Sequence, residues 1–521
     1  MSAVRELAIN FSYFVVNAGR TGPICFFFNY FLPEGLYFSK LLCRGNSFNC
    51  PVLIKIMIDL RGFIRELERN NKLKRVKAPV DKNWEVSCIA RIVMGFPPQK
   101  RYAILFENVK GFKNPVLINA FASRDLYAIG LESAVREIEE RWDSALKNLL
   151  NPETVGQASC KENVLVGDEV DLNLFPHAVY TPEKDGAPYI ASGCVVLKDP
   201  ETGVQNAGIY RCMVKGKNKL GLHMEPPHDG GIIFSKYREM GKPMEVAIAI
   251  GLPPVVHMAA AAKIPYGVDE FAVAGGLAKA PLKVAKCETL DLKVPADAEI
   301  VIEGVVPPRS VEPEGPFGEF YGYMGERGID PVINVTAITF RNDPIYQLLL
   351  QQKAPNEGNV LRDVTMEAFL KGKLKSAGVP GVTGICIRET SAIEHLVVGI
   401  KKLYPGHALT VAQACWVAYP LAFKQIIVVD DDCDVFNSED VEWRLATCVQ
   451  PERDIQIITN AAANPLDPSV QREKRGQGSK MLIDATRKLK YPETALPPEQ
   501  MLEEARKRWD SYGLPELNKK S

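Results

Sequence analysis

The sequence has no surplus of charge of either sign. Its 521 residues contain 63 Lys and Arg against 63 Asp and Glu, so the formal net charge is zero. Proteins that bind nucleic acid through a broad basic field need such a surplus, so we expect no nucleic-acid partner. The hydrophobic fraction of 46% is too high for a disordered chain. The length corresponds to several domains of about 100–200 residues each.

Cysteine and long apolar runs are also scarce. The twelve cysteines include no C-x-x-C pair, which argues against a zinc knuckle, and we expect free thiols in a reducing cytoplasm. Two uncharged, phenylalanine-rich runs, residues 7–19 and 21–33, are each shorter than the roughly 20 apolar residues that span a bilayer, so we expect no membrane span.

Several nucleotide-binding and nucleophile motifs are missing. The sequence contains no G-x-x-x-x-G-K phosphate loop, no G-x-G-x-x-G after a strand and no G-x-S-x-G elbow. The acidic run 430–434 lacks the glycine and the distal glutamate of a calcium loop, so we interpret it as an acidic turn at a strand end.

The first 56 residues differ from the rest of the chain. They are rich in phenylalanine and carry five basic and two acidic residues, which leaves a net charge of −3 on the remainder. Glu6 and Arg20 interrupt the order expected of a signal peptide. Met57, in contrast, opens an amphipathic helical pattern. We therefore interpret residues 1–56 as an atypical extension and favour Met57 as the native start, with a genuine N-terminal segment as the alternative.

The remaining sequence predicts an α/β (α+β) protein of several parts. Residues 57–160 form a small α/β domain, with a helix from residue 57, buried strands at 103–106 and 116–118, and a helix over 124–150. In residues 161–350 short apolar runs alternate with Gly and Pro, which predicts an antiparallel sheet or barrel. The expected strands are 191–197, 208–214, 246–251, 255–261, 299–304, 332–340 and 345–350, with one helix near 230–240.

Helices and strands alternate again towards the C-terminus. Residues 351–490 predict an α/β domain with crossover connections. Its expected helices are 360–371, 408–417 and 441–447, and its expected strands are 382–388 and 425–429. Residues 491–521 form a tail with a charged helix over about 498–509, which either docks on a neighbour or is solvated.

Two glutamates are candidates for acid–base chemistry. Glu314 and Glu319 are five residues apart, and the intervening Gly315-Pro316-Phe317-Gly318 must turn the backbone, which can bring both carboxylates to one pocket. Paired carboxylates push their pKa values apart and leave one of them a proton to donate. A solvated loop is the alternative.

Polar residues elsewhere offer further candidate ligands. Arg211 lies in an apolar run, where burial is costly unless it meets a carboxylate or a phosphate; an exposed edge strand is the alternative. Among only six histidines, His228 lies in a Pro-Pro-His-Asp-Gly-Gly loop. Asn206, His228 and Glu270 would supply one nitrogen and two oxygen donors, which suit Mn²⁺ or Mg²⁺ better than zinc or copper. Spacing alone does not select this set.

Taken together and in order, these segments resemble the UbiD family of prenylated-FMN-dependent decarboxylases. The similarity covers about residues 57–514 and is greatest to the hydroxyarylic (phenolic) acid decarboxylases. The segments that carry it are Asn-x-Gly-Ile-Tyr-Arg at 206–211, Glu-Gly-Pro-Phe-Gly-Glu at 314–319, Pro-Tyr-Ile at 188–190, Asp-Pro at 199–200, Tyr-Pro-Gly-His-Ala at 404–408, and Gly-Ser-Lys-Met at 478–481 followed by Asp-Ala-Thr at 484–486.

The resemblance implies a role for each matching residue. A divalent metal, usually Mn²⁺, would bind Asn206, His228 and Glu270 and hold the phosphate of prenylated FMN. A monovalent cation, usually K⁺, would bind the backbone near Ala259, Ala260 and Ala262 together with Glu270. The cofactor would also contact Gly208, Ile209, Arg211 and Pro227, although many relatives have Gln where this chain has Pro227. Arg211, Glu314 and Glu319 match the family's catalytic network, with Glu319 as our choice of acid.

The resemblance also implies an architecture and an activity. We expect an N-terminal α/β region, a flavin-binding split β-barrel and a C-terminal α/β domain that assembles a homo-oligomer, either a dimer or a hexamer. The expected activity is non-oxidative decarboxylation of an aromatic or α,β-unsaturated carboxylic acid, with the direction left open and a flavin prenyltransferase as cofactor supplier. The alternatives are a decarboxylase of anhydromevalonate phosphate or of a polyprenyl hydroxybenzoate, and a non-catalytic subunit of a multi-component carboxylase.

Overall fold

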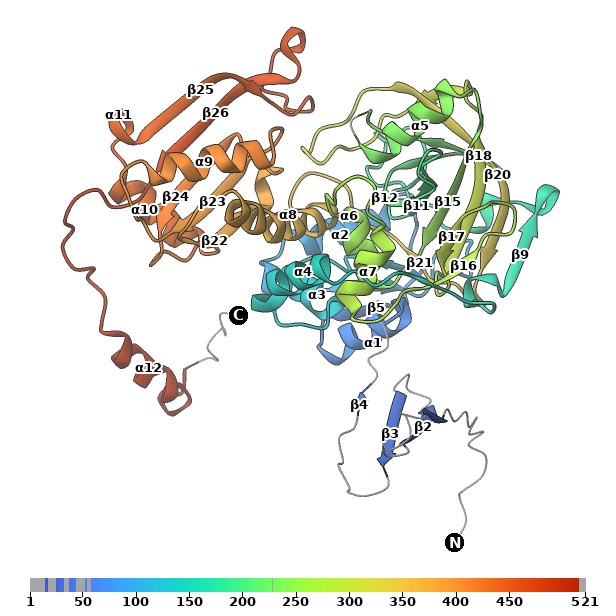
Figure 1. Ribbon diagram of the computed structural model, residues 1–521, viewed down its shortest axis with the longest axis horizontal. Helices are drawn as coiled ribbons and strands as arrows, with labels where there is room; N and C mark the ends of the chain where they lie inside the picture. The colour runs from blue at the N-terminus through green and yellow to red at the C-terminus, as the bar shows by residue number, and fades with distance from the viewer. Residues whose placement is uncertain are drawn as a thin grey trace. The chain divides into compact units, whose positions relative to one another are not determined.

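The computed structural model describes residues 58–226 and 228–514, together with four short paired strands before residue 58. These strands are β1 (Val15–Val16), β2 (Cys25–Phe31), β3 (Tyr37–Cys43) and β4 (Val52–Leu53). The described residues do not include the rest of residues 1–57, Pro227 or residues 515–521. The interpretation of residues 1–56 as an atypical extension therefore stays a prediction. The chain divides into two compact units, residues 1–372 with 389–392, and residues 373–388 with 393–521 (Figure 1). Among the described residues, no helix is long and apolar enough to cross a membrane.

The first unit begins with a small α/β region. Asp59 caps its first helix by accepting a hydrogen bond from the Gly62 N–H at 2.7 Å, and the helix buries Leu60, Phe63, Ile64 and Leu67 as the amphipathic pattern predicts. The sheet has the order β21-β7-β6-β5, so a strand from much later in the chain pairs with β7. The elements are α1 (Leu60–Arg69), β5 (Leu73–Val76), α2 (Glu85–Met94), β6 (Ala103–Phe106), β7 (Val116–Ile118), α3 (Arg124–Gly130), α4 (Ile138–Lys147) and β21 (Tyr346–Gln347).

The helix predicted over residues 124–150 is wrong in one respect. The structure divides it into α3 and α4, because Glu132 adopts a left-handed backbone conformation with φ of 50° that no right-handed helix can continue through. The apolar spacing continues across the break, which is why periodicity alone did not reveal it. The strands predicted at 103–106 and 116–118 are confirmed as β6 and β7.

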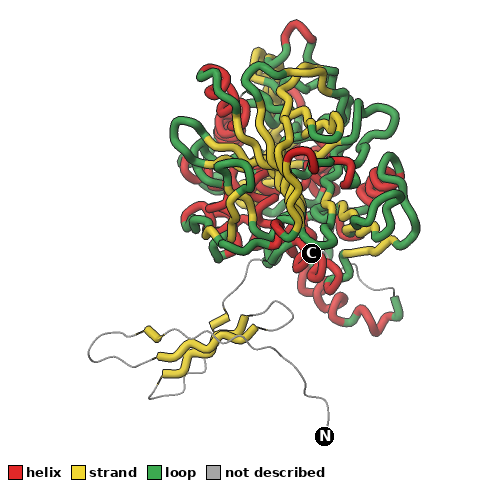
Figure 2. Tube along the Cα trace, turned by 90° about the vertical axis from the view of Figure 1, so that its right-hand side faces the viewer, coloured by secondary structure: helices red, strands yellow, loops and turns green. Residues whose placement is uncertain are grey.

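A ten-stranded antiparallel sheet forms the centre of the first unit, in agreement with the predicted antiparallel sheet or barrel. Figure 2 shows its long strands side by side, with helices and loops around them. The path β10-β13-β14-β20-β18-β15-β11-β12 is joined by β9 and β19, which both pair with β20. The strands are β9 (Asn163–Val166), β10 (Tyr189–Ile190), β11 (Cys194–Lys198), β12 (Gln205–Ile209), β13 (Cys212–Gly216), β14 (Lys219–Leu222), β15 (Met244–Ile250), β18 (Ile300–Val306), β19 (Val311–Glu314) and β20 (Gly328–Phe340).

Three helices and a small second sheet accompany the central sheet. The helices are α5 (Asp229–Glu239), α6 (Pro254–Ala261) and α7 (Glu270–Ala278), and the second sheet contains β8 (Glu153–Thr154), β16 (Lys283–Lys286) and β17 (Lys293–Pro295). The helix near 230–240 is confirmed as α5, but the strand predicted at 255–261 is wrong, because this segment is α6. Pro254 suits the first turn of a helix, and a short segment that is apolar on every side has no period that separates helix from strand.

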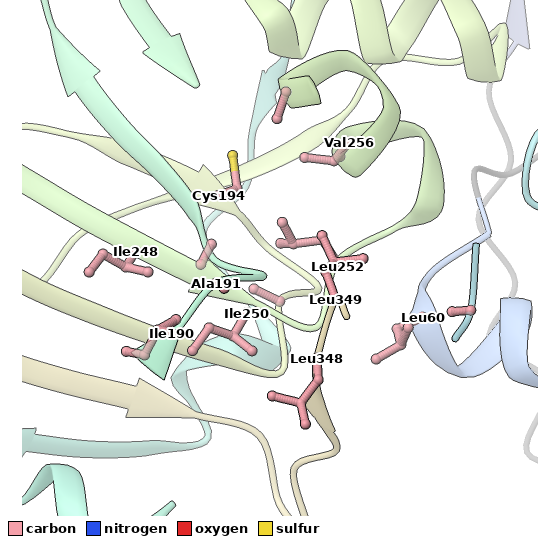
Figure 3. Packing of buried hydrophobic residues seen from close by; sticks show 14 of the residues in the cluster. Leu60, Ile190, Ala191, Cys194, Ile248, Ile250, Leu252, Val256, Leu348 and Leu349 are labelled. Carbon is pink, nitrogen blue, oxygen red and sulfur yellow. The ribbon is translucent and has the colours of Figure 1, made fainter. Parts of the chain in front are cut away.

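One continuous hydrophobic core connects the small α/β region with the central sheet. Figure 3 shows Leu60 of α1 near Leu252, Leu348 and Leu349, which follow β15 and β21, with Ile248 and Ile250 of β15 further into the sheet. These side chains are buried. Because this core is shared and close-packed, it holds the strands of the central sheet in fixed positions.

The second unit contains a mixed sheet accompanied by helices. Its sheet has the order β22-β23-β24-β26-β25, with β23, β24 and β26 parallel and the two outer strands antiparallel. Its elements are β22 (Val382–Ile387), β23 (His395–Ile400), α9 (His407–Ala418), β24 (Gln425–Asp430), α10 (Ser438–Cys448), α11 (Pro451–Asp454), β25 (Ile455–Ala462), β26 (Gln477–Asp484) and α12 (Glu499–Lys507). Helix α8 (Glu357–Ser376) extends from the first unit into this one.

Candidate active site

The structure brings Arg211, Glu314 and Glu319 together. The residue Arg211 lies in the two-residue gap between β12 and β13, where its backbone carbonyl accepts the N–H of His223 at 3.1 Å. Its Nε and Nη2 donate to the two oxygens of Glu314 at 3.1 and 2.9 Å, and its Nη1 donates to Oε1 of Glu319. The guanidinium therefore bridges two carboxylates, and their negative charge compensates the positive charge of a buried arginine.

Burial differs sharply between the two glutamates. The side chain of Glu314 is 1% exposed and that of Glu319 is 19% exposed, while Arg211 is 11% exposed. Burial by itself lowers the pKa of Arg211, but its hydrogen bonds with both glutamates raise that pKa above its usual value, so the guanidinium stays charged. Of the two carboxyl groups, that of Glu319 is the more exposed.

A short turn places the two glutamates on the same guanidinium. Glu314 ends β19, and the turn closes where the N–H of Gly186 donates to the carbonyl of Pro316 at 2.8 Å. Phe317 in this turn is buried, with its ring centroid 4.4 Å from that of Tyr189 and 5.5 Å from the Arg211 guanidinium carbon. The turn predicted from Gly315 to Gly318 is thus present, and aromatic packing holds it.

A second polar group lies at the other end of the 206–211 segment. The carboxylate of Glu270, at the start of α7, accepts Nδ2–H of Asn206 at 2.9 Å and the N–H of Ala207 at 2.8 Å. The buried Oδ1 of Asn206 has no hydrogen-bond partner among the described residues. Burial raises the pKa of Glu270 to about 8. The unpaired amide oxygen of Asn206 and the buried carboxylate of Glu270 are both oxygen donors, and together they fit a divalent metal ion.

The third expected metal ligand stands at the N-terminus of α5. His228 is the residue before this helix, and desolvation lowers its pKa, which favours the neutral imidazole that binds metals. The following residue, Asp229, is near enough to Glu270 to raise its pKa. The N–H of Gly230 donates to the hydroxyl of Tyr210 at 2.9 Å, which ties α5 to the Asn206 strand. Pro227 lies outside the described residues.

The remaining residues implied as cofactor contacts lie on elements that pack together. Gly208 and Ile209 belong to β12, which packs against both α6 and α7. A Cβ at Gly208 would lie 2.6 Å from the Tyr210 ring, so this position has no room for a side chain. Ala259 and Ala260 are buried in the last turn of α6, where the carbonyl of Ala259 accepts the N–H of Ala262 at 3.1 Å and the end of the helix carries partial negative charge suited to a cation.

Sequence reasoning missed a second carboxylate cluster beside Glu314. His223 follows β14, and its Nδ1 lies 2.8 Å from Oδ2 of Asp330 and its Nε2 lies 3.2 Å from Oε1 of Glu225. One donor atom each from His223, Asp330 and Glu314 all lie within 4.8 Å of one another. Burial by itself lowers the pKa of His223, but the hydrogen bonds to Asp330 and Glu225 raise it to about 9. No sequence signal joins residues 107 positions apart.

Three family models match the chain in sequence order. The N-terminal, Rift-related and C-terminal domains of the 3-octaprenyl-4-hydroxybenzoate carboxy-lyase (UbiD) match residues 64–142, 153–354 and 359–485. An uncharacterized protein of Synechocystis is 32% identical over 88% of this chain and 97% of its own length. An uncharacterized protein of Aquifex aeolicus is 35% identical over 88% of this chain and 99% of its own length.

Solved structures show the same fold. The UbiD-class enzyme HmfF from Pelotomaculum thermopropionicum, in complex with FMN, is 34% identical and superposes with a TM-score of 0.79 over 85% of this chain and 98% of that one. An evolved dimeric form of HmfF in complex with prFMN is 33% identical, with a TM-score of 0.77 over 85% and 98% of the two chains. The vanillic acid decarboxylase of Sedimentibacter hydroxybenzoicus is 30% identical, with a TM-score of 0.79 over 88% and 100%.

Proposed function

The chain belongs to the UbiD family of carboxy-lyases, and from this premise we propose that it decarboxylates an aromatic or α,β-unsaturated carboxylic acid with prenylated FMN as cofactor. The observation that carries the proposal is the guanidinium of Arg211 shared between Glu314 and Glu319. A hydroxyaryl acid is the favoured substrate class. Structural relatives named as vanillic acid and 3,4-dihydroxybenzoic acid decarboxylases, at 30% and 27% identity, support that choice.

The chemistry requires an electron sink and a proton. Loss of CO₂ from an sp² carbon leaves an electron pair on that carbon, and the prenylated flavin, when bound, supplies the sink that stabilises it. The protein supplies the proton. Glu319 is the more exposed of the two glutamates and donates its proton to the carbon that CO₂ leaves. Arg211 orients Glu319 and keeps the paired carboxylates from repelling each other.

The polar group around Glu270 has a separate task. Asn206, His228 and Glu270 would hold Mn²⁺ or another divalent ion, which would neutralise the cofactor phosphate. The carbonyl groups near Ala259, Ala260 and Ala262, together with Glu270, would hold K⁺. Arg211 makes none of its described side-chain hydrogen bonds to the residues of either ion site, because these bonds go to Glu314 and Glu319.

The decisive experiment uses the full chain co-expressed with a flavin prenyltransferase and purified without oxygen in Mn²⁺ and K⁺. We expect the absorbance of a prenylated flavin and CO₂ release from vanillate or 3,4-dihydroxybenzoate. Release only from a phosphorylated aliphatic acid or a polyprenyl hydroxybenzoate would replace the substrate class and keep the chemistry. A protein that takes up no flavin under these conditions would contradict the proposal. Turnover only after a second polypeptide is added would identify the chain as a subunit of a multi-component enzyme. Light scattering on the same sample would give the size of the expected homo-oligomer.

A further inference from the structure

The histidine cluster beside Glu314 has no part in the function argued so far. His223 is 27% exposed, Asp330 is 16% exposed and Glu225 is 51% exposed, so the cluster runs from the buried Glu314 towards the surface. The strand register explains the arrangement. His223 hydrogen-bonds to the backbone of Arg211, and Asp330 lies on β20 opposite Glu312, two residues before Glu314 on β19.

Charge around this cluster is unbalanced without a protonated histidine. The groups around His223 are Asp330 from β20, Glu225 from the loop after β14, Glu314 from β19, Arg211 before β13, and His228, whose pKa is lowered mainly by desolvation and further by the charges of Lys263 and His223. Arg211 already bridges both glutamates of the candidate network. A further carboxylate, Asp330, has an oxygen within 4.8 Å of one of Glu314 and calls for a second cation, and a ring nitrogen of His223 lies within 4.8 Å of both.

We propose that His223 is a positioning residue for the Arg211–Glu314–Glu319 network: clamped by Asp330 as an imidazolium, it holds Glu314 ionised and leaves Glu319 as the carboxyl group that carries the transferable proton. Two cations then lie near Glu314, Arg211 by hydrogen bonds and His223 within 4.8 Å, whereas Glu319 has Arg211 alone among the described contacts. The raised pKa of His223, about 9, agrees with a charged ring at neutral pH. The inference rests on the proposed function for its catalytic consequence and on geometry for the charge itself.

The contacts favour a protonated His223 over a metal ion bound by His223, Asp330 and Glu314. His223 and Asp330 are already hydrogen-bonded to each other at 2.8 Å, and both oxygens of Glu314 receive hydrogen bonds from Arg211. A cation bound there would have to displace the guanidinium from Glu314 or lie close to its positive charge, and both arrangements are unfavourable. We therefore treat metal binding at His223 as an outcome that would overturn the proposal.

The first test needs no activity. The chain has only six histidines, so the ring of His223 can be followed by NMR in isotope-labelled protein without cofactor and assigned by its loss in His223→Gln. We expect His223 to be protonated at pH 7 and to titrate near pH 9. Asp330→Asn and Glu314→Gln should each lower the titration midpoint, because coupling between two sites is reciprocal. A neutral ring at pH 7, a midpoint that Glu314→Gln leaves unchanged, or loss of the ring's titration on adding diamagnetic Mg²⁺ would overturn the proposal.

The second test uses the cofactor-loaded enzyme. We expect wild-type kcat to fall as the pH rises through about 9, where His223 loses its proton. His223→Gln should lower kcat at pH 7 by about 10–100-fold, with a smaller change in KM, and should lack that alkaline decline. His223→Lys restores a cation and should regain part of the lost kcat, with the decline moved towards the ordinary lysine value of about 10.4.

His395→Gln, in β23 of the second unit, is the matched control and should leave the profile unchanged. A His223→Gln enzyme with wild-type kcat and pH profile would refute the role. Failure of the proposed function is distinguishable, because a wild type without turnover would still give the NMR result, and an unmoved midpoint in Glu314→Gln would then refute the inference independently.

Discussion

Arg211 is the residue on which the candidate site depends. Its three described side-chain hydrogen bonds reach two carboxylates that are five residues apart in the chain. Lysine would offer a single point of charge and not a planar fork, so it would not hold both glutamates in one geometry. The sequence left open whether Arg211 is buried against a carboxylate or phosphate or exposed on an edge strand, and the structure supplies two carboxylate partners.

Removal of the proposed acid should stop turnover without loss of the cofactor. We expect Glu319→Gln to lower kcat by about 10²–10⁴-fold, because glutamine keeps the shape and the hydrogen bond but has no transferable proton. The measurement is CO₂ release, with the flavin absorbance recorded on the same sample. Glu312→Gln is the control. Glu312 precedes the same turn but pairs with Lys219 at 2.8 Å at a partly exposed site, and its loss should change kcat by less than about twofold.

At the scale of elements, the turn between the two glutamates depends on a close approach of two backbones. A Cβ on Gly186 would lie 2.4 Å from the carbonyl oxygen of Gly315, so a side chain there must push the turn away. We expect Gly186→Ala to lower kcat by about 10–100-fold, since a displacement near 1 Å at reacting groups has that cost. Kinetics and the thermal unfolding temperature should be measured together. Gly156→Ala is the control, because a Cβ there meets nothing within 4 Å.

If Gly186→Ala kept wild-type kcat, the turn would not position the glutamates as described.

Other elements show which features the periodicity of the sequence does not predict. The strands of the central sheet follow predicted apolar runs, but the predicted strand 208–214 is interrupted at Tyr210 and Arg211, between β12 and β13. That interruption lets Arg211 reach β19, and no period of two could have indicated it.

At the scale of the whole molecule, a buried carboxyl group on α8 couples stability to pH. Glu357 is fully buried and accepts the N–H groups of Asn119, Phe121 and Leu350 at 2.9–3.1 Å. Burial raises its pKa to about 7, although these hydrogen bonds oppose the shift. A carboxyl group with a raised folded-state pKa contributes its full stability below its unfolded pKa, and that contribution is lost as the pH rises through about 7.

We therefore expect the free energy of unfolding to fall between pH 5 and pH 8 by about 2 kcal/mol more in the wild type than in Glu357→Gln, which has no group to titrate there. Denaturant titrations of both proteins at the two pH values measure the difference. Glu326→Gln, at an exposed position, should retain the wild-type slope. Equal slopes for wild type and Glu357→Gln would show that Glu357 does not titrate in this range.

The sequence by itself determined the α/β class, the antiparallel character of the centre, the family resemblance and the candidate residues Asn206, Arg211, Glu314 and Glu319, because periodicity and short motifs are local properties of the chain. Tertiary structure decided which of these residues meet. Strand pairing brings Arg211 to Glu314 across 103 positions and His223 to Asp330 across 107, and these distances along the chain leave no local trace. Tertiary structure also decided that residues 254–261 form the helix α6, which packs against β12, and not the predicted strand. Because this segment is buried on every side, its sequence has no apolar period that would distinguish a helix from a strand.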